Sequence, residues 1–315
     1  MNQLGLGNVQ TNTNQQPCTL MRRTSLIYLL LSAAACTSRA LDISSIDYAW
    51  PEPPKVGDNT LHILTTNLLE LKLINTKPAD PAKVTQWDFV KNGQFVAPRK
   101  SSFAVTADGK SVSVKGIYFK RRPFYGPFSP RDLRIENSLY LLLASSISDN
   151  QVVEVKNPNG QLWPSTMIFK ATKDPLRFSP ATHVNQEGYM PNNTKKAMVG
   201  YYAGNLGEMG IPASAGFKLV DANSGVQIYQ GSLVQRRDSG YTYSPLPYQQ
   251  VYEADFSTFN TPGEYRLVVP GLGGSLPFLI HDGIAMSRFH RTVVGYSRPE
   301  YRKAAMPECR LPPTG

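Results

Sequence analysis

The stretch Thr261-Pro-Gly-Glu-Tyr-Arg-Leu-Val-Val269 contains a turn signal followed directly by a strand signal. In Pro262-Gly263, proline presets φ and glycine permits a positive φ, so the pair predicts a tight reversal of the chain. Tyr265, Leu267 and Val269 would share one face of the following strand, because side chains alternate across a strand. The stretch therefore predicts a β-strand buried on one face.

Similar segments surround this stretch and together predict a small β-sandwich over residues 181–282. The turn Ala222-Asn-Ser-Gly225 separates two of the segments. Further strand-like runs occur at Lys195–Gly200, Phe217–Asp221, Val226–Gly231, Tyr252–Ser257 and Ser275–Ile280.

The first half of the chain has the same organisation, with turn signals at Asp108-Gly109 and Asn157-Pro-Asn-Gly160. This spacing predicts another β-sandwich over residues 41–180. The aromatic, proline-containing segment Phe124–Phe128 is expected to form a loop. Strand-like runs lie at Leu61–Leu64, Leu68–Ile74, Phe103–Val105, Val112–Phe119, Ser138–Ala144 and Val152–Val155.

Composition agrees with this reading. The chain has 315 residues, of which 41% are hydrophobic and 18% charged, as in a globular protein with room for about two domains. Its 25 prolines, 24 glycines and 16 tyrosines favour short strands joined by turns over long helices. The predicted fold class is all-β, with two consecutive immunoglobulin-like β-sandwich domains and a short C-terminal helix.

Residues 1–40 are interpreted as an upstream extension followed by a signal peptide that begins at Met21. Two arginines precede an apolar run from Leu26 to Ala35, and Ser38-Arg-Ala40 forms a small-x-small cleavage site. The protein is therefore expected to be secreted or periplasmic. Lipid anchoring at Cys36 is not favoured, because Ala33 stands where leucine is usual.

Cysteine and charge exclude several kinds of function. Cys18 and Cys36 lie in or before the signal, so Cys309 would be alone in the mature chain and could form neither a disulfide framework nor a cysteine zinc site. The net charge of +10 falls to +7 without residues 1–40, because 30 basic residues then face 23 acidic ones. The densest basic cluster, Lys120–Arg122, is too short to indicate a nucleic-acid site without a recognisable motif.

Four motifs carry a family resemblance. In chain order they are Val184-Asn-Gln-Glu-Gly-Tyr-Met-Pro191, Asp255-Phe-Ser257, Pro262-Gly-Glu-Tyr265 and Ser275-Leu-Pro-Phe-Leu-Ile280. Together they resemble the N-terminal immunoglobulin-like domain that precedes the catalytic barrel in many cellulases of glycoside hydrolase family 9. The resemblance implies that an (α/α)₆ barrel would follow, with its first helix beginning near Gly283.

The barrel motifs of that family do not map onto this chain. Where the resemblance leads one to expect a Tyr-x-Gln-Arg-Cys-Gly-like segment, residues 296–302 read Tyr-Ser-Arg-Pro-Glu-Tyr-Arg, and 13 residues follow. Inverting hydrolysis needs two carboxyl groups about 6.5–9.5 Å apart, and the family's carboxylates have no counterpart here. No catalytic, cofactor-binding or metal-binding residue is therefore assigned, and the chain alone is expected to be inactive.

Other chemistries find little support. The histidines His62, His183, His281 and His290 lack metal-ligand spacing. Gly273-Gly-Ser275 lacks half of a nucleophile elbow, and Gly204-Asn-Leu-Gly207 is expected to be a loop, not a phosphate cradle. Asp221, Asp238 and Asp255 were weighed as calcium ligands, but their spacing favours turn capping and surface solvation.

Residues 283–315 are interpreted as the truncated start of a catalytic domain, followed by a basic, proline-rich tail. Ile284, Phe289 and Val293 have helical spacing, and the prolines from Pro299 onward would end the helix. Two explanations stay open for the tail, namely a shifted or prematurely ended reading frame and a short form with a role of its own.

Two functions are therefore carried forward. The first is the non-catalytic N-terminal part of a secreted family 9 glycoside hydrolase, with β-glucan as the polysaccharide partner of the whole enzyme. The alternative is a secreted carbohydrate-binding or adhesion module that stacks aromatic rings on sugars. Trp87, Tyr125, Phe128 and Trp163 are the candidates for that stacking, although large aromatic side chains also commonly fill cores.

Overall fold

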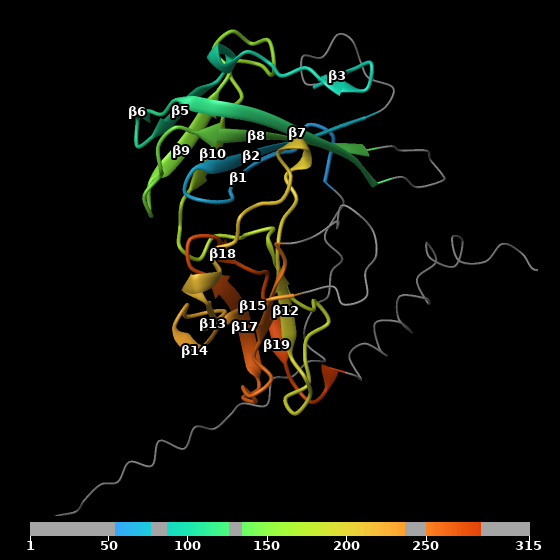
Figure 1. Cartoon of the computed structure of the whole chain (residues 1–315), viewed down its shortest axis with the longest axis vertical. Helices are drawn as coiled ribbons and strands as arrows, with labels where there is room; N and C mark the ends of the chain where they lie inside the picture. The colour runs from blue at the N-terminus through green and yellow to red at the C-terminus, as the bar shows by residue number, and fades with distance from the viewer. Residues whose placement is uncertain (1–53, 77–86, 126–133, 237–249, 285–315) are drawn as a thin grey trace, which may run out of the picture. The chain divides into compact units, whose positions relative to one another are not determined.

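The computed structural model describes residues 54–76, 87–125, 134–236 and 250–284, all within one compact unit that spans residues 41–315 (Figure 1). Strands dominate these residues, so the all-β expectation is confirmed. Three 3₁₀ turns interrupt them: η3 (Lys100–Ser102), η4 (Gly204–Leu206) and η5 (Ala213–Ala215). In the part of the chain described, no helix has the length and apolar character needed to cross a membrane.

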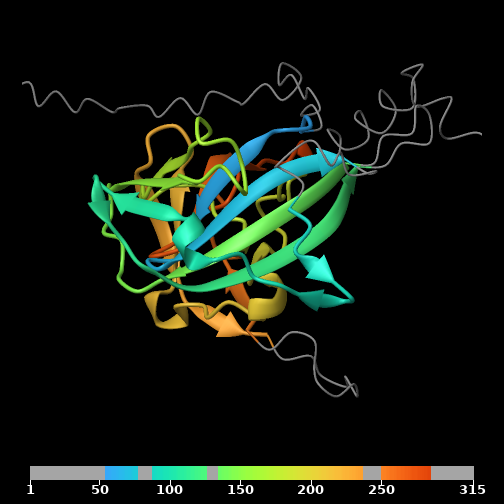
Figure 2. The ribbon, with the colours of Figure 1, turned by 90° about the horizontal axis from the view of Figure 1, so that it is seen from above.

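The first sandwich consists of two four-stranded antiparallel sheets. One sheet has the order β1 (Asn59–Ile63), β2 (Leu68–Thr76), β8 (Arg134–Leu143), β7 (Val114–Tyr125). The facing sheet has the order β10 (Phe169–Thr172), β9 (Val152–Lys156), β5 (Ala104–Ala107), β6 (Lys110–Ser111). A small hairpin of β3 (Val90–Lys91) and β4 (Gln94–Phe95) is added. Figure 2 shows the long strands β2, β8 and β7 running side by side.

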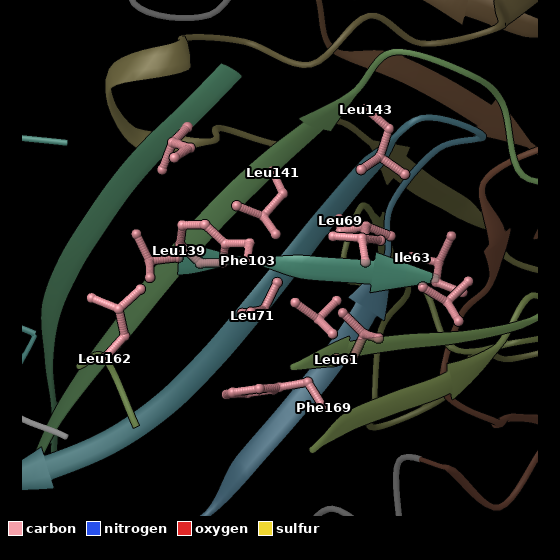
Figure 3. Packing of buried hydrophobic residues seen from close by; sticks show 14 of the residues in the cluster. Leu61, Ile63, Leu69, Leu71, Phe103, Leu139, Leu141, Leu143, Leu162 and Phe169 are labelled. Carbon is pink, nitrogen blue, oxygen red and sulfur yellow. The ribbon is translucent and has the colours of Figure 1, made fainter. Parts of the chain in front are cut away.

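The core of the first sandwich is apolar and aromatic. Leucines that alternate along β2 and β8, such as Leu71 and Leu139, point between the sheets (Figure 3). Trp163 is fully buried, and its ring centroid lies 5.0 Å from that of Phe169 and 5.9 Å from that of Trp87. The indole N–H of Trp87 donates to the carbonyl of Leu162 at 2.8 Å, so its one polar atom is satisfied.

The structure departs from the sequence expectations at one aromatic segment. Phe124 and Tyr125 belong to β7, where Tyr125 lies opposite Arg134 of β8, so the expected loop over Phe124–Phe128 was wrong for its first two residues. Ten register pairs join β8 to β7, with one irregularity near each end of β7, and this pairing extends the strand past Pro123. The remaining residues of that segment lie outside the described part.

The second sandwich also consists of two sheets. One has the order β11 (Thr182–His183), β12 (Lys196–Val199), β16 (Tyr252–Asp255), β15 (Leu233–Gln235). The other has the order β14 (Gln227–Gly231), β13 (Phe217–Asp221), β17 (Gly263–Val269), β18 (Gly273–Gly274), and β19 (Phe278–Ile280) also pairs with β17.

Strand β17 pairs with β13, β18 and β19, and one of its faces is buried, as its sequence predicts. Tyr265, Leu267 and Val269 are all buried. The hydroxyl of Tyr265 donates back to the carbonyls of Thr261 at 3.3 Å and Pro262 at 3.2 Å. Such a bond from an early strand residue to the preceding corner is the tyrosine corner of immunoglobulin-like sandwiches. The Pro-Gly-x-Tyr motif thus fixes the turn into the strand.

The opening motif holds the segment that leaves the second sandwich. Gly188 has φ 99°, and a Cβ at this position would lie 2.7 Å from the carbonyl oxygen of Leu279 and 2.8 Å from Cδ1 of Ile284. Tyr189 pairs in parallel with Ile280. A side chain at residue 188 would therefore displace the outgoing chain. The helix expected from Gly283 lies beyond the described residues after Ile284.

Candidate functional site

A buried carboxylate marks the contact between the two sandwiches. Glu70 of β2 lies opposite His62 of β1 and Tyr140 of β8. Residues opposite each other in neighbouring strands share a face of the sheet, and the flanking Leu69 and Leu71 fill the core behind it. Glu70 therefore points to the outer face, where it is fully buried.

Side chains from both sandwiches surround the Glu70 carboxylate. Its Oε2 lies 2.8 Å from Nδ1 of His62. Its Oε1 accepts hydrogen bonds from the hydroxyl of Tyr201, in the second sandwich, at 2.7 Å and from the hydroxyl of Tyr140 at 3.1 Å. A carboxylate only accepts hydrogen bonds, so Nδ1 of His62 carries the hydrogen in this contact. We call Glu70, His62, Tyr140 and Tyr201 the Glu70 cluster.

The electrostatics keep Glu70 ionised. Burial raises the pKa of its carboxyl group, but the hydrogen bond from His62 and the charge of Lys72 outweigh that effect and hold the pKa at about 2. Burial and the nearby Glu70 charge raise the pKa of both Tyr140 and Tyr201, which therefore stay protonated as donors. Glu70, Tyr140 and Tyr201 therefore keep fixed protonation states at neutral pH, which makes these three groups poor general acids or bases.

The turn η4 of the second sandwich docks on strand β7 of the first. The side-chain oxygen of Asn205 accepts from the backbone N–H of Phe119 at 2.8 Å. A Cβ at Gly204 would lie 2.1 Å from the carbonyl oxygen of Phe119, and Gly204 has φ 59°. Only glycine permits this close approach of two backbones at such a φ. The segment expected to be a plain loop is a docking turn.

Arg177 joins the two sandwiches along the covalent connection. Its Nε donates to the carbonyl of Ile63 in the first sandwich at 2.8 Å, and its Nη2 donates to the carbonyl of Gly271 in the second at 2.9 Å. The neighbouring Phe178 ring lies edge-on to His62, with centroids 5.8 Å apart. The connecting segment is thus bonded to both bodies that it links.

The side chains of the basic cluster Lys120–Arg122 make intramolecular contacts. Lys120 donates to the carbonyl of Tyr202 at 3.1 Å and lies 4.7 Å from the centroid of the Tyr201 ring. Arg121 donates to Asn137 at 2.7 Å, and Arg122 binds both oxygens of Glu136 at 2.8 and 3.1 Å. Each side chain of the densest positive run thus has a partner within the chain.

Two of the candidates for sugar stacking lie side by side but are buried. Trp87 and Trp163 are in the core of the first sandwich, so the core interpretation is confirmed for both. The side chain of Tyr125 and all of Phe128 lie outside the described residues. Exposed aromatic side chains in the described part include Phe124, Phe178 and Tyr202.

The described histidines and aspartates that are candidate ligands make separate local contacts. Nε2 of His183 lies 3.1 Å from the carbonyl oxygen of Gly200, and Nδ1 of His281 accepts from the N–H of Gly283. Asp221 accepts from Ser224 and Asp255 from Ser257, as expected of turn caps. Among described residues, no group of three or more His, Cys, Asp or Glu could hold a metal ion; His290 and Asp238 lie outside them.

Ser275 is a structural residue in this arrangement. It is fully buried, and its hydroxyl accepts from the N–H of Leu267 at 3.0 Å and donates to the carbonyl of Leu276 at 2.7 Å. Gly273 forms the short strand β18 with Gly274. A Cβ at Gly273 would lie 2.4 Å from the carbonyl oxygen of Arg177. The absence of a side chain at Gly273 therefore lets the backbone of β18 pack closely against the connecting segment.

Comparison with known proteins agrees with the class of domain that this geometry defines. The second sandwich is an immunoglobulin-like domain, and residues 177–274 match the family described as the cellulase N-terminal ig-like domain. Endoglucanase D of Acetivibrio thermocellus is 28% identical over 138 residues, which cover 44% of this chain and 19% of that protein. The resemblance stated from the four motifs is confirmed.

Two solved structures described as glycoside hydrolases of family 9 also match part of this chain. A structure described as Bacteroides ovatus GH9 has 31% sequence identity and a TM-score of 0.25, covering 34% of this chain and 16% of that one. A metagenome-derived glycoside hydrolase family 9 endoglucanase has 25% identity and a TM-score of 0.24, covering 32% and 18%. The chain spans 19% or less of the length of the curated relatives that it matches.

Proposed function

We propose that this chain is the non-catalytic N-terminal part of an exported family 9 glycoside hydrolase that acts, as a whole enzyme, on β-1,4-glucan. The match of residues 177–274 to the cellulase N-terminal ig-like domain carries this proposal. In the whole enzyme, the two sandwiches would form a support beside the catalytic domain. They are held together as one body by the Glu70 cluster, the docking turn η4 and Arg177.

Several acidic side chains of the described residues are engaged in structural contacts, which supports a non-catalytic role. Glu70 is enclosed by its cluster, and Glu136 is 2% exposed and held by Arg122 and Lys72. Glu154 pairs with Lys156 and Lys170 at the sheet surface. A general acid needs a carboxyl group that can reach the substrate and whose pKa is near the working pH, whereas the pKa values of these three groups are lowered.

The activity test uses the full chain in a reducing-sugar assay on carboxymethylcellulose, beside a cellulose pull-down. We expect no sugar release and no retention on cellulose. Sugar release would contradict the proposal. Retention without release would favour the alternative, a carbohydrate-binding module, and Phe124→Ala and Tyr202→Ala would then test whether exposed rings mediate it.

Export is proposed from the arginine pair and apolar run that begin at Met21. In a bacterial host, the exported form should begin at Leu41 when its N-terminus is sequenced. Leu30→Arg places a charge in the apolar run and should keep the chain inside the cell. Equal export of this variant and the parent would contradict the assignment, and Asn14→Arg, upstream of Met21, is the matched control.

A further inference from the structure

A lysine ammonium is enclosed by oxygen atoms at one end of the second sandwich. Lys195, directly before β12, has no exposed surface. Its Nζ donates to the carbonyl of Asn193 at 2.9 Å, the carbonyl of Ser257 at 3.1 Å and the side-chain oxygen of Asn260 at 3.2 Å. The carbonyl of Pro191 is a fourth acceptor. We call these four oxygens the Lys195 cage.

The cage joins two loops that are far apart in the sequence. Pro191 ends the opening motif and Asn193 comes two residues later, whereas Ser257 and Asn260 follow β16. The backbone adds two more bonds, from the N–H of Phe256 to the carbonyl of Lys195 at 3.0 Å and from the N–H of Lys195 to the hydroxyl of Ser257 at 2.9 Å. The oxygens are thus held in position by the chain on both sides of the ammonium.

We propose that the Lys195 cage is a monovalent-cation site whose resident cation is the Lys195 ammonium, and that it binds a free alkylammonium ion when this side chain is shortened. Converging carbonyl oxygens can replace the hydration shell of a monovalent cation. An ammonium has three N–H donors and no acceptor, so the four oxygens share three protons. The cage therefore offers at least one acceptor to each N–H of the ammonium.

Size and charge argue against a calcium ion as the ligand of this site. Three of the four distances from Nζ to oxygen, 2.9–3.2 Å, exceed the roughly 2.3–2.6 Å of calcium–oxygen bonds. All four oxygens belong to neutral carbonyl or amide groups, whereas calcium sites commonly include carboxylates. The ligand class is therefore an ammonium-type cation.

The Lys195 ammonium and the four oxygens stabilise each other. A buried lysine without partners is unfavourable, and the oxygens supply those partners. Burial lowers the pKa of Lys195, and the nearby Asp255 carboxylate opposes this shift. Removal of the ammonium would leave the acceptors facing one another without a donor. An apolar stem alone cannot satisfy them.

The test is chemical rescue of Lys195→Ala in the full chain, followed by thermal unfolding. This variant lacks three methylene groups and the ammonium, which n-propylammonium supplies. We expect the melting temperature to fall by about 5–10 °C, consistent with a loss of a few kcal/mol in a domain of this size. Tens of millimolar n-propylammonium chloride should restore at least half of the loss, whereas n-propanol and calcium chloride should not.

Two further variants decide between charge and packing. Lys196→Ala removes the exposed neighbour and should show no rescue by n-propylammonium. Lys195→Met keeps the apolar stem, so a melting temperature equal to that of the parent would overturn the proposal. Equal stabilisation of parent and Lys195→Ala by n-propylammonium would also overturn it. If Lys195→Ala does not fold, soluble yield in n-propylammonium against n-propanol becomes the readout, and equal yields contradict the proposal.

Discussion

The core of the first sandwich and the contact between the sandwiches are both buried, yet they are built differently. The core is formed by leucines and by the rings of Trp87, Trp163 and Phe169, and apolar packing dominates it. The hydrogen bonds of these rings are the ones from the indole N–H groups to the carbonyls of Leu162 and Met167. The contact adds the Glu70 cluster, whose atoms must meet within hydrogen-bond distance. Apolar burial supplies most of the stability of a fold, whereas a satisfied polar network restricts the ways in which two bodies fit.

This difference predicts different responses to substitution. Changes in the core should lower the free energy of unfolding at every pH. Changes in the contact should show a dependence on pH or on backbone geometry that the core lacks.

Trp163→Ala tests the core and should have the largest effect. Removing this fully buried ring is expected to lower the free energy of unfolding by about 4 kcal/mol, because the lost burial is compounded by a cavity. Urea unfolding measures the change. Phe124→Ala is the matched control, since its ring is 40% exposed and its loss should change stability by no more than about 0.5 kcal/mol. Similar losses in both variants would contradict the assignment of the core.

Glu70→Gln tests the contact through pH. The pKa of Glu70 is lowered from 4.5 to about 2, so the unfolded chain binds this proton at a higher pH than the folded chain does. The stabilisation is complete above about pH 5 and is lost as the pH falls toward 2, which amounts to about 3 kcal/mol. Urea unfolding from pH 7 to 2 should give a flatter profile for Glu70→Gln. Parallel profiles for variant and parent would contradict the role of Glu70.

Gly204→Ala tests the docking turn. The new Cβ would clash with the Phe119 carbonyl and sit at an unfavourable φ, with an expected loss of about 2 kcal/mol. Gly207→Ala is the control, because Gly207 has φ 90° but nothing within 4 Å of the added atom. The difference between the two variants in urea unfolding isolates the close approach of the two backbones. Equal losses would mean that only the φ matters.

Arg122→Ala tests an exposed residue on the sheet face that also carries Glu70, and it should have the smallest effect. The Arg122 side chain is 55% exposed, and Glu136 would keep Lys72 at 3.3 Å. Solvent screens such a pair, so we expect a loss of no more than about 1 kcal/mol, falling further in 0.5 M salt. A loss as large as that of Trp163→Ala would contradict this view of Arg122.

The sequence predicted the β-strands better than it predicted the contacts between distant side chains. Strands with alternating side chains, such as the one with Tyr265 and Leu267, were found because the period of two is a local property. The strand β6 and the hairpin β3–β4 were missed, since two-residue strands carry no periodic signal. Strand β7 was predicted too short, because its pairing with β8 overrides the local turn signal at Pro123.

The Glu70 cluster could have been suspected in part. Glu70 and Lys72 interrupt the apolar run Leu68–Ile74, and a charge within a buried strand is a sign of a special site. Its partners could not be found this way, because Tyr201 lies 131 residues away. The same holds for Lys195, whose environment depends on a loop 62 residues later in the chain. Such long-range contacts are set by tertiary packing and leave no local pattern in the sequence.

The parallel pairing of Tyr189 with Ile280 has a mechanical consequence. The N–H of Tyr189 donates to the carbonyl of Leu279 at 2.8 Å, and the N–H of His281 donates to the carbonyl of Tyr189 at 3.0 Å. Tension between the incoming chain at Tyr189 and the outgoing chain at His281 would pull two parallel segments in opposite directions. Both hydrogen bonds would then be loaded in shear at the same time, so this exit is built to transmit tension without opening one bond after another.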